Sequence, residues 1–281
     1  MRPSSQLNHL LKVSAIICIG VLALILFFVI SKSLPFFQQI GFTSLWLDDG
    51  WYPTESNFNL IPMILGSLYI MFGAVLLASP IGIMLAIFIQ YYAPPKVAKI
   101  YRALIELLAG IPSVVYGFWG LIVLVPLVAS WVQPGASVLT ACLVLALMIL
   151  PLVTLMTDNA LSQIPEKWTA AADALAIKRW SKIWNIALPH AAPSIIAGTV
   201  LQAGRALGET MAVLMVCGNI VQIPTSIFEP ARTLTANIAL EMAYATDNHI
   251  SALFVSGLVL LIITILMTLF MARIKKNNIV A

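Results

Sequence analysis

Apolar residues fill six long stretches of this chain, and short polar segments separate them. The stretches lie at about 11–30, 61–92, 103–130, 137–157, 194–217 and 251–272. Each has about 18 residues or more, which as a helix crosses a hydrocarbon core about 30 Å thick. The pattern predicts an all-α membrane helix bundle with about six transmembrane helices, forming one domain over residues 1–281.

Two prolines interrupt these stretches. Pro80 lies inside the second and Pro112 inside the third. Because proline lacks the N–H that an interior helical position donates, we expect each helix to bend there or to begin with a re-entrant piece.

The composition excludes a soluble protein. Hydrophobic residues make up 61% of the chain and charged residues 9%, against about 25% charged in ordinary soluble domains. The net charge of +4 resides in short loops, so it indicates topology and no nucleic-acid partner. The three cysteines have no partner at metal-ligand spacing, and we expect no metal site.

Basic residues divide unevenly between the two sides of the predicted spans. Twelve lie on one side: Arg2, Lys12, Lys96, Lys99, Arg102, Lys167, Lys178, Arg179, Lys182, Arg273, Lys275 and Lys276. Only Lys32 and Arg232 lie on the other side. Arg205 is not counted, because it lies inside a predicted span. This asymmetry predicts that both termini are cytoplasmic.

The segment 204–210, GRALGET, places two charges inside an otherwise apolar span. If the helix begins near Ile195, Arg205 lies about 15 Å along it, close to the middle of the membrane. Glu209 follows one turn later, on the same helical face. The two side chains either neutralise each other or line the path of an anion, because a guanidinium matches the oxygens of an oxyanion such as phosphate. Ser113 and Tyr116, after Pro112 in the broken helix, are weaker candidates for the same path.

Small residues recur along the same predicted helix. Gly204, Gly208 and Ala212 are spaced by four, which allows another helix to approach closely. The pattern leaves open whether that helix belongs to this chain or to a partner subunit.

The inner loop, about 158–193, is the one sizeable connection on the basic side. Its alanine-rich part and its two tryptophans predict a pair of short surface helices that ends at Leu188-Pro189. They either lie on the lipid headgroups or dock a cytoplasmic protein. We expect Asp158 to be a solvated cap and Arg102 to pair with Glu106.

This loop resembles the EAA loop of bacterial ABC importer permeases, in segments 169–176 (TAAADALA) and 186–189 (IALP). The resemblance implies that the loop docks into an ATPase subunit. The coupling positions would be Ala170, Ala171, Ala172, Asp173, Ala176, Trp180, Leu188 and Pro189. The family usually has Glu at the position of Ala170 and Gly at the position of Ala176.

Three further segments, 106–120, 148–151 and 204–213, resemble the permeases of phosphate-uptake systems, and among them the PstC-type subunit. The resemblance implies a type I ABC importer permease that moves inorganic phosphate across the bacterial inner membrane. Its partners would be a PstA-type sister permease, an ATPase dimer and an extracytoplasmic phosphate-binding protein. The chain has no G-x-x-x-x-G-K-[ST] motif, so we expect no enzymatic activity and no cofactor, with ATP and Mg²⁺ bound by the partner ATPase.

Other functions remain open from the residues themselves. A permease for another oxyanion, sulfate or molybdate, would suit the Arg-Glu pair equally well. A secondary transporter would predict inverted repeats, and none is visible. A membrane enzyme would need a cluster of ionisable groups near one interface.

Overall fold

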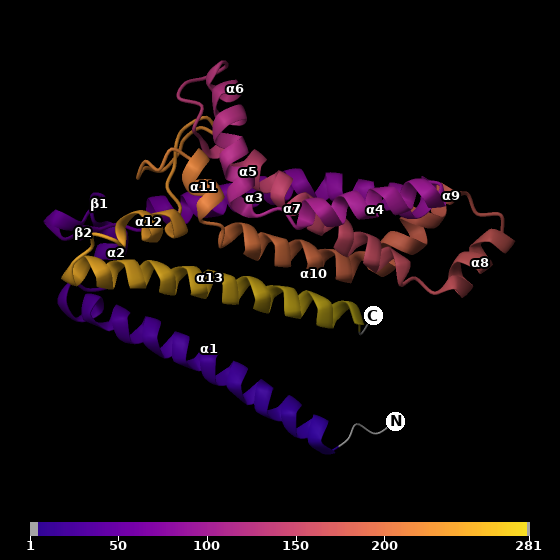
Figure 1. Cartoon of the computed structure of the whole chain (residues 1–281), viewed down its shortest axis with the longest axis horizontal. Helices are drawn as coiled ribbons and strands as arrows, with labels where there is room; N and C mark the ends of the chain where they lie inside the picture. The colour runs from indigo at the N-terminus through magenta and orange to yellow at the C-terminus, as the bar shows by residue number, and fades with distance from the viewer. Residues whose placement is uncertain (1–4, 280–281) are drawn as a thin grey trace.

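The computed structural model describes residues 5–279; Arg2, used above for orientation, lies outside them. Helix α1 (Ser5–Gln39) runs antiparallel to α13 (Asp247–Ile279), as Figure 1 shows. Phe28 packs edge-on against Phe254 with 5.6 Å between the ring centroids, which links the two helices.

The centre of the bundle is the contact between α3 (Ile61–Ile87) and α7 (Val138–Ser162). At Gly73 of α3, the side chain of Cys142 on α7 occupies the space that a Cβ would need. Helix α3 continues through Pro80 to a π-helical turn at Phe88–Tyr92, so no re-entrant piece begins at this proline. A proline inside a membrane helix is tolerated where packing compensates the lost hydrogen bond.

The third apolar stretch forms two separate segments. Helix α4 (Pro95–Ala109) and the helical segment Ser113–Ala129 are inclined by 88°. That segment contains α5 (Ser113–Trp119), a π-helical turn and α6 (Val125–Ala129). The expected break at Pro112 is confirmed, but α4 begins earlier than the predicted span.

The fifth apolar stretch also contains a break. Helix α10 (Leu188–Leu207) ends before Gly208, and α11 (Met211–Val216) begins three residues later. The prediction of one helix over 194–217 is therefore wrong. Leu188 begins α10 instead of ending the preceding helix, because Pro189 occupies its first turn, where proline is favoured.

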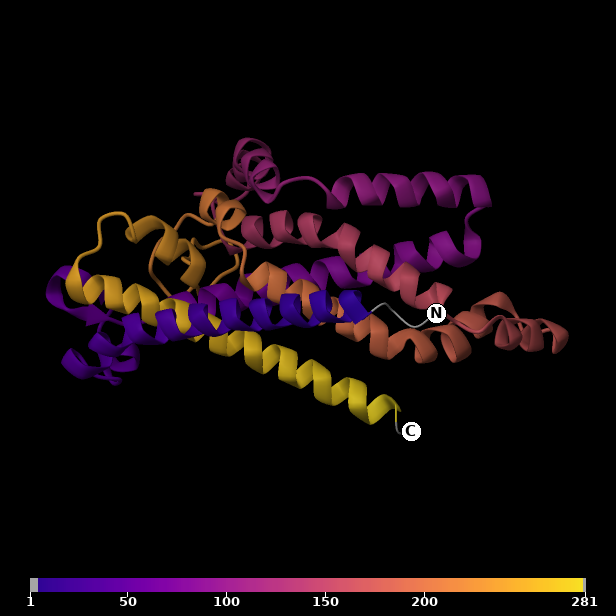
Figure 2. The ribbon, with the colours of Figure 1, turned by 60° about the horizontal axis from the view of Figure 1, so that its bottom comes forward.

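The end of the bundle that carries the basic loop is called the inner end, and the opposite end is called the outer end. The inner end carries two short helices, α8 (Glu166–Ala174) and α9 (Arg179–Lys182), with a π-helical turn at Ile183–Ala187. The start of α1 and the end of α13 lie at this same end in both views (Figures 1 and 2). Among residues 5–279, five helices are long and apolar enough to span a membrane, or six with the bent pair. The prediction of about six spans is confirmed.

The outer end is built from short elements. These are α2 (Ser44–Leu47), a two-stranded antiparallel hairpin of β1 (Trp51–Tyr52) and β2 (Asn57–Phe58), and α12 (Leu234–Glu241). The hairpin was not predicted, since strands of two residues have no periodicity to detect.

Candidate substrate path and docking surfaces

Arg205 and Glu209 lie on either side of the break between α10 and α11. Arg205 is exposed in the last turn of α10, whereas Glu209 lies in the non-helical segment. Within residues 5–279, no ion pair includes Arg205 or Glu209. Instead, Glu209 Oε1 accepts a hydrogen bond from the backbone N–H of Ala212, 3.2 Å away, in the first turn of α11. The expectation that both charges share one helical face is wrong.

The break in α4–α5 lies beside the break in α10–α11. Helix α5 packs on α11 so closely that a Cβ at Gly117 would lie 2.7 Å from Cα of Ala212. Tyr116 donates its hydroxyl to the carbonyl of Leu108, at 2.9 Å, and so spans the bend between α4 and α5. Ser113 begins α5, one turn before Tyr116.

The predicted small-residue stripe is divided by the same break. Ala212 is buried and faces Gly117, as a close helix contact requires. A Cβ at Gly204 would meet nothing within 4 Å, so Gly204 serves no close contact inside this chain. Gly208 lies at the end of α10 and is exposed.

The inner helices expose an apolar surface. Leu175, Trp180 and Trp184 are 75%, 63% and 50% exposed, and the two tryptophan rings lie 5.3 Å apart. Ala172 and Ile183, on the same two helical segments, are buried. The helix pair is thus amphipathic, as predicted, and its apolar face is free to contact a membrane or a protein.

The remaining coupling positions lie on the same two helices or just after them. Three of them are exposed on α8: Ala170, Ala171 and Asp173. The carboxylate of Asp173 forms an ion pair with Lys182 Nζ, 2.7 Å away. Ala176 follows α8 with φ +52°, a left-handed conformation that glycine adopts more readily.

A partly buried ion pair joins the middle of α4 to α7. Arg102 binds Asp158 at 2.7 Å, and the Asp158 residue is 6% exposed. Both expectations for this region are wrong, since Arg102 does not pair with Glu106 and Asp158 is not solvated. The reason is that α4 folds back along α7, which brings a guanidinium to the carboxylate.

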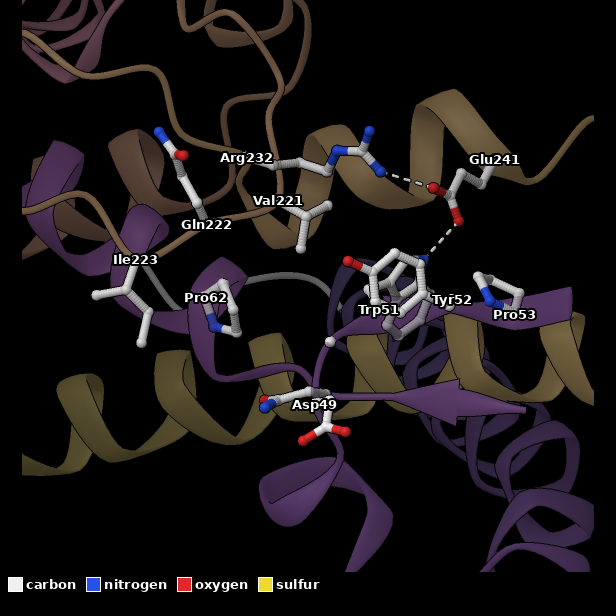
Figure 3. A pocket seen from close by; sticks show the side chains of 12 residues that line it. Asp49, Trp51, Tyr52, Pro53, Pro62, Val221, Gln222, Ile223, Arg232 and Glu241 are labelled. Carbon is white, nitrogen blue, oxygen red and sulfur yellow. Dashed lines mark hydrogen bonds and ion pairs between the residues drawn. The ribbon is translucent and has the colours of Figure 1, made fainter. Parts of the chain in front are cut away.

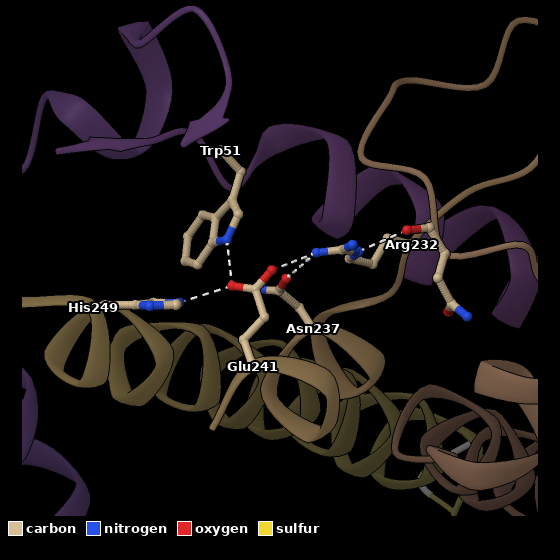
Figure 4. Close-up of polar contacts among 6 residues, drawn as sticks. Trp51, Arg232, Asn237, Glu241 and His249 are labelled. Atoms are coloured by element: carbon tan, nitrogen blue, oxygen red, sulfur yellow. Dashed lines mark hydrogen bonds and ion pairs between the residues drawn. The ribbon is translucent and has the colours of Figure 1, made fainter. Parts of the chain in front are cut away.

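The outer end contains a polar cluster that the sequence analysis missed. Glu241 accepts hydrogen bonds from Trp51 Nε1 at 2.7 Å and Arg232 Nη1 at 2.6 Å, and it contacts His249 Nε2 at 2.8 Å (Figure 4). Arg232 also donates to Asn237 Oδ1, at 3.0 Å. We call these five residues the Glu241 cluster. Trp51 is 190 positions from Glu241, so no local pattern could predict the contact.

A cavity of about 530 Å³ opens beside this cluster (Figure 3). Aromatic, proline and aliphatic side chains share its wall with three charged ones. The lining residues are Asp49, Gly50, Trp51, Tyr52, Pro53, Asn59, Pro62, Val221, Gln222, Ile223, Arg232 and Glu241.

Two titratable side chains at the outer end have shifted pKa values. Partial burial and the charge of Glu241 raise the pKa of Tyr244. Hydrogen bonds from the backbone N–H and then the hydroxyl of Thr225 lower the pKa of Glu229. In the described part of the chain, no group of three or more His, Cys, Asp or Glu residues could hold a metal ion.

A bundle of membrane-length helices, two of them broken beside an exposed arginine, defines a multi-pass membrane transport subunit. The chain belongs to the family of binding-protein-dependent transport system inner membrane components, whose model matches residues 78–278. The prediction that this chain is a multi-pass membrane protein is therefore confirmed.

Two relatives within this family are named as transport permeases. The chain is 34% identical over 267 residues to the phosphate transport system permease protein PstC of Pasteurella multocida, covering 86% of this chain and 83% of that protein. It is 38% identical over 234 residues to the probable ABC transporter permease protein YqgH of Bacillus subtilis, covering 81% and 76%.

A solved structure supports the fold. A chain in the crystal structure of a bacterial alginate ABC transporter, in complex with an alginate pentasaccharide-bound periplasmic protein, superposes with a TM-score of 0.67. The match covers 98% of this chain and 99% of that chain at 17% identity. The predicted all-α fold of an ABC importer permease is confirmed.

Proposed function

We propose that this chain is the membrane-spanning subunit of an ATP-driven importer of inorganic phosphate. The observation that carries the proposal is Arg205, an exposed guanidinium beside two broken helices with no ion-pair partner among residues 5–279. The relatives named as phosphate permeases supply the identity of the anion.

Arg205 suits the passage of an anion. Its planar donors match two phosphate oxygens, and an unpaired positive charge at membrane depth lowers the cost of moving a negative ion there. Glu209 forms no ion pair with it in the described part of the chain, and its carboxylate instead accepts from the N–H of Ala212 at the start of α11. The breaks themselves expose backbone groups, which is tolerated in a membrane where they line a cavity. Tyr116 and Ser113 would extend the path along α5.

The partner contacts follow from the two ends. The inner surface of Leu175, Trp180 and Trp184 would dock the ATPase dimer, which binds ATP and Mg²⁺; no cofactor is expected in this chain. Large aromatic side chains in a protein groove are typical interface anchors. The outer end would receive the phosphate-binding protein, and a PstA-type sister permease would complete the path.

The orientation follows from charge. The ends of α1 and α13 lie with the basic inner helices, so both termini would be cytoplasmic under the positive-inside rule.

The proposal is tested by purifying the tagged chain from membranes and assaying ATPase activity in lipid nanodiscs. We expect a co-purifying ATPase and stimulation by a binding protein loaded with phosphate. Stimulation by a sulfate- or molybdate-loaded protein instead would assign another oxyanion. Anion transport with no ATPase partner would refute the proposal and favour a secondary transporter.

A further inference from the structure

Helix α12 connects the Glu241 cluster to the break that carries Glu209. In its first turn, Thr235 donates its hydroxyl to the backbone carbonyl of Glu209, 2.9 Å away. In its last position, Glu241 binds Trp51 of the outer hairpin and Arg232 of the preceding loop. Thr235 and Glu241 are six residues apart, so about 9 Å of helix separates the two contacts.

Both contacts are buried. Thr235 is 7% and Glu241 is 6% exposed. If the hairpin moved without α12, the carboxylate of Glu241 would lose the hydrogen bond from the indole of Trp51, which costs free energy for a buried acceptor. Figure 4 shows the indole of Trp51 and the guanidinium of Arg232 directed at this carboxylate from different elements. A displacement of the hairpin is therefore expected to move α12 with it.

The segment at the other end of α12 combines local and distant contacts. Gly208, Glu209 and Thr210 are not helical, although the N–H groups of Gly208 and Glu209 donate to the carbonyls of Gly204 and Ala206 at the end of α10. The carbonyl of Glu209 is bound by Thr235, and its carboxylate caps α11 through Ala212. Arg205 lies one turn before this segment.

We propose that Thr235 and Glu241 are positioning residues that couple the outer hairpin to the Glu209 segment through α12. A partner that enters the 530 Å³ cavity contacts Trp51, Arg232 and Glu241 directly and so acts on the same carboxylate. The role of this coupling in transport rests on the proposed function, whereas the coupling itself does not.

The direct test is amide hydrogen exchange of residues 208–212 in the assembled complex in nanodiscs. The variant Trp51→Phe removes the indole donor and keeps an aromatic ring, and Thr235→Val removes the hydroxyl at constant shape. We expect each to speed exchange at residues 208–212 by about three- to tenfold. The double variant should exceed the larger single effect by little, because both changes break one connection.

Matched controls separate coupling from general loosening. Thr154→Val removes a buried hydroxyl that binds only the carbonyl of Leu150 on its own helix. Trp46→Phe changes a half-exposed outer tryptophan on α2. Neither should alter exchange at residues 208–212. Unchanged exchange in Trp51→Phe, or two effects that multiply in the double variant, would overturn the coupling.

The functional consequence is measured separately. In Thr235→Val, ATPase stimulation by the phosphate-loaded binding protein should fall while basal ATPase activity and assembly persist, because Thr235 does not line the cavity that the partner would enter. Stimulation equal to that of the unmodified complex would overturn the role in transport. If the unmodified complex is not stimulated at all, the proposed function fails, and the exchange result still decides the coupling.

Discussion

Arg102 on α4 and Asp158 on α7 form a two-pronged ion pair. Nε lies 2.7 Å from Oδ2, and Nη2 lies 3.0 Å from Oδ1. Nη2 also donates to Gln90 Oε1, at 2.9 Å, in the π-helical turn after α3. The pair therefore joins three elements at the inner end of the bundle, just before the chain leaves α7 for α8.

Asp158→Asn is expected to destabilise the protein by about 1 kcal/mol, since the partly exposed guanidinium of Arg102 loses its charged acceptor. The measurement is the thermal midpoint of the purified complex. Asp173→Asn is the matched control, because its pair with Lys182 has an Asp side chain that is 64% exposed. That change should cost less than about 0.5 kcal/mol. Equal losses in the two variants would contradict the structural role of Arg102.

Ala176→Gly is expected to stabilise the inner loop by about 1 kcal/mol. Ala176 has φ +52°, and a Cβ in this conformation is strained by contact with the following carbonyl. Hydrogen exchange of residues 175–178 should slow in the variant. Ala174→Gly, inside α8, should do the opposite by a similar amount because glycine weakens a helix. Faster exchange in Ala176→Gly would argue against the left-handed turn.

Gly117→Ala is expected to separate α5 from α11. Its new methyl group would lie 2.7 Å from backbone Cα of Ala212, which a rotamer change cannot relieve. We expect a loss of about 1–3 kcal/mol in stability, together with reduced uptake. Gly204→Ala has open space in this chain and should leave its stability within about 0.5 kcal/mol. Equal thermal midpoints in the two variants would contradict the close contact between α5 and α11.

Arg205→Gln is expected to abolish phosphate uptake in vesicles while the complex assembles and hydrolyses ATP. The amide keeps part of the shape and removes the charge that favours an anion at this depth. Arg205→Lys should retain partial uptake, since it keeps the charge and loses the paired donors. Arg273→Gln, at the exposed inner end of α13, is the control and should transport normally. Normal uptake by Arg205→Gln would remove Arg205 from the path.

The turn between Thr225 and Glu229 is expected to stay closed as the pH falls past the ordinary carboxyl pKa of 4.5. The folded pKa is lowered by hydrogen bonds from Thr225, at 2.7 and 2.9 Å, so this stabilisation exists above the unfolded pKa. It is lost only when the pH drops through the folded value. Exchange of the Thr225 amide, corrected for its intrinsic pH dependence, should show this, and Glu229→Gln should abolish the transition. An opening midpoint at or above 4.5 would contradict it.

Local patterns predicted much of the fold. The lengths of the apolar stretches determine the spans, because a helix of given length either crosses the bilayer or does not. The break at Pro112 was predictable, since proline removes the same hydrogen bond in any context. At Pro80, by contrast, packing of α3 against α7 compensates the loss and the helix continues. The helical spacing of apolar residues in the inner loop, Trp180 among them, also predicted the amphipathic inner helices.

The candidate site was only partly predictable. The sequence identified Arg205, because an arginine among apolar neighbours is rare and costly. It did not reveal the break after Leu207, since the residues around Glu209 are compatible with a continuous helix. At that break, the carbonyl of Glu209 accepts from Thr235, 26 positions away, and its carboxylate accepts from the N–H of Ala212.

By itself, the sequence determined that this is a membrane bundle of about six spans with one charged position at depth, because hydrophobic length and local spacing act within a few residues. Only the tertiary structure decided which charges meet. It placed Arg102 against Asp158 and Trp51 against Glu241, and it left Arg205 without an ion-pair partner among residues 5–279. These contacts join residues 56 and 190 positions apart, which only the packing of α4, α7 and α12 brings within hydrogen-bond distance.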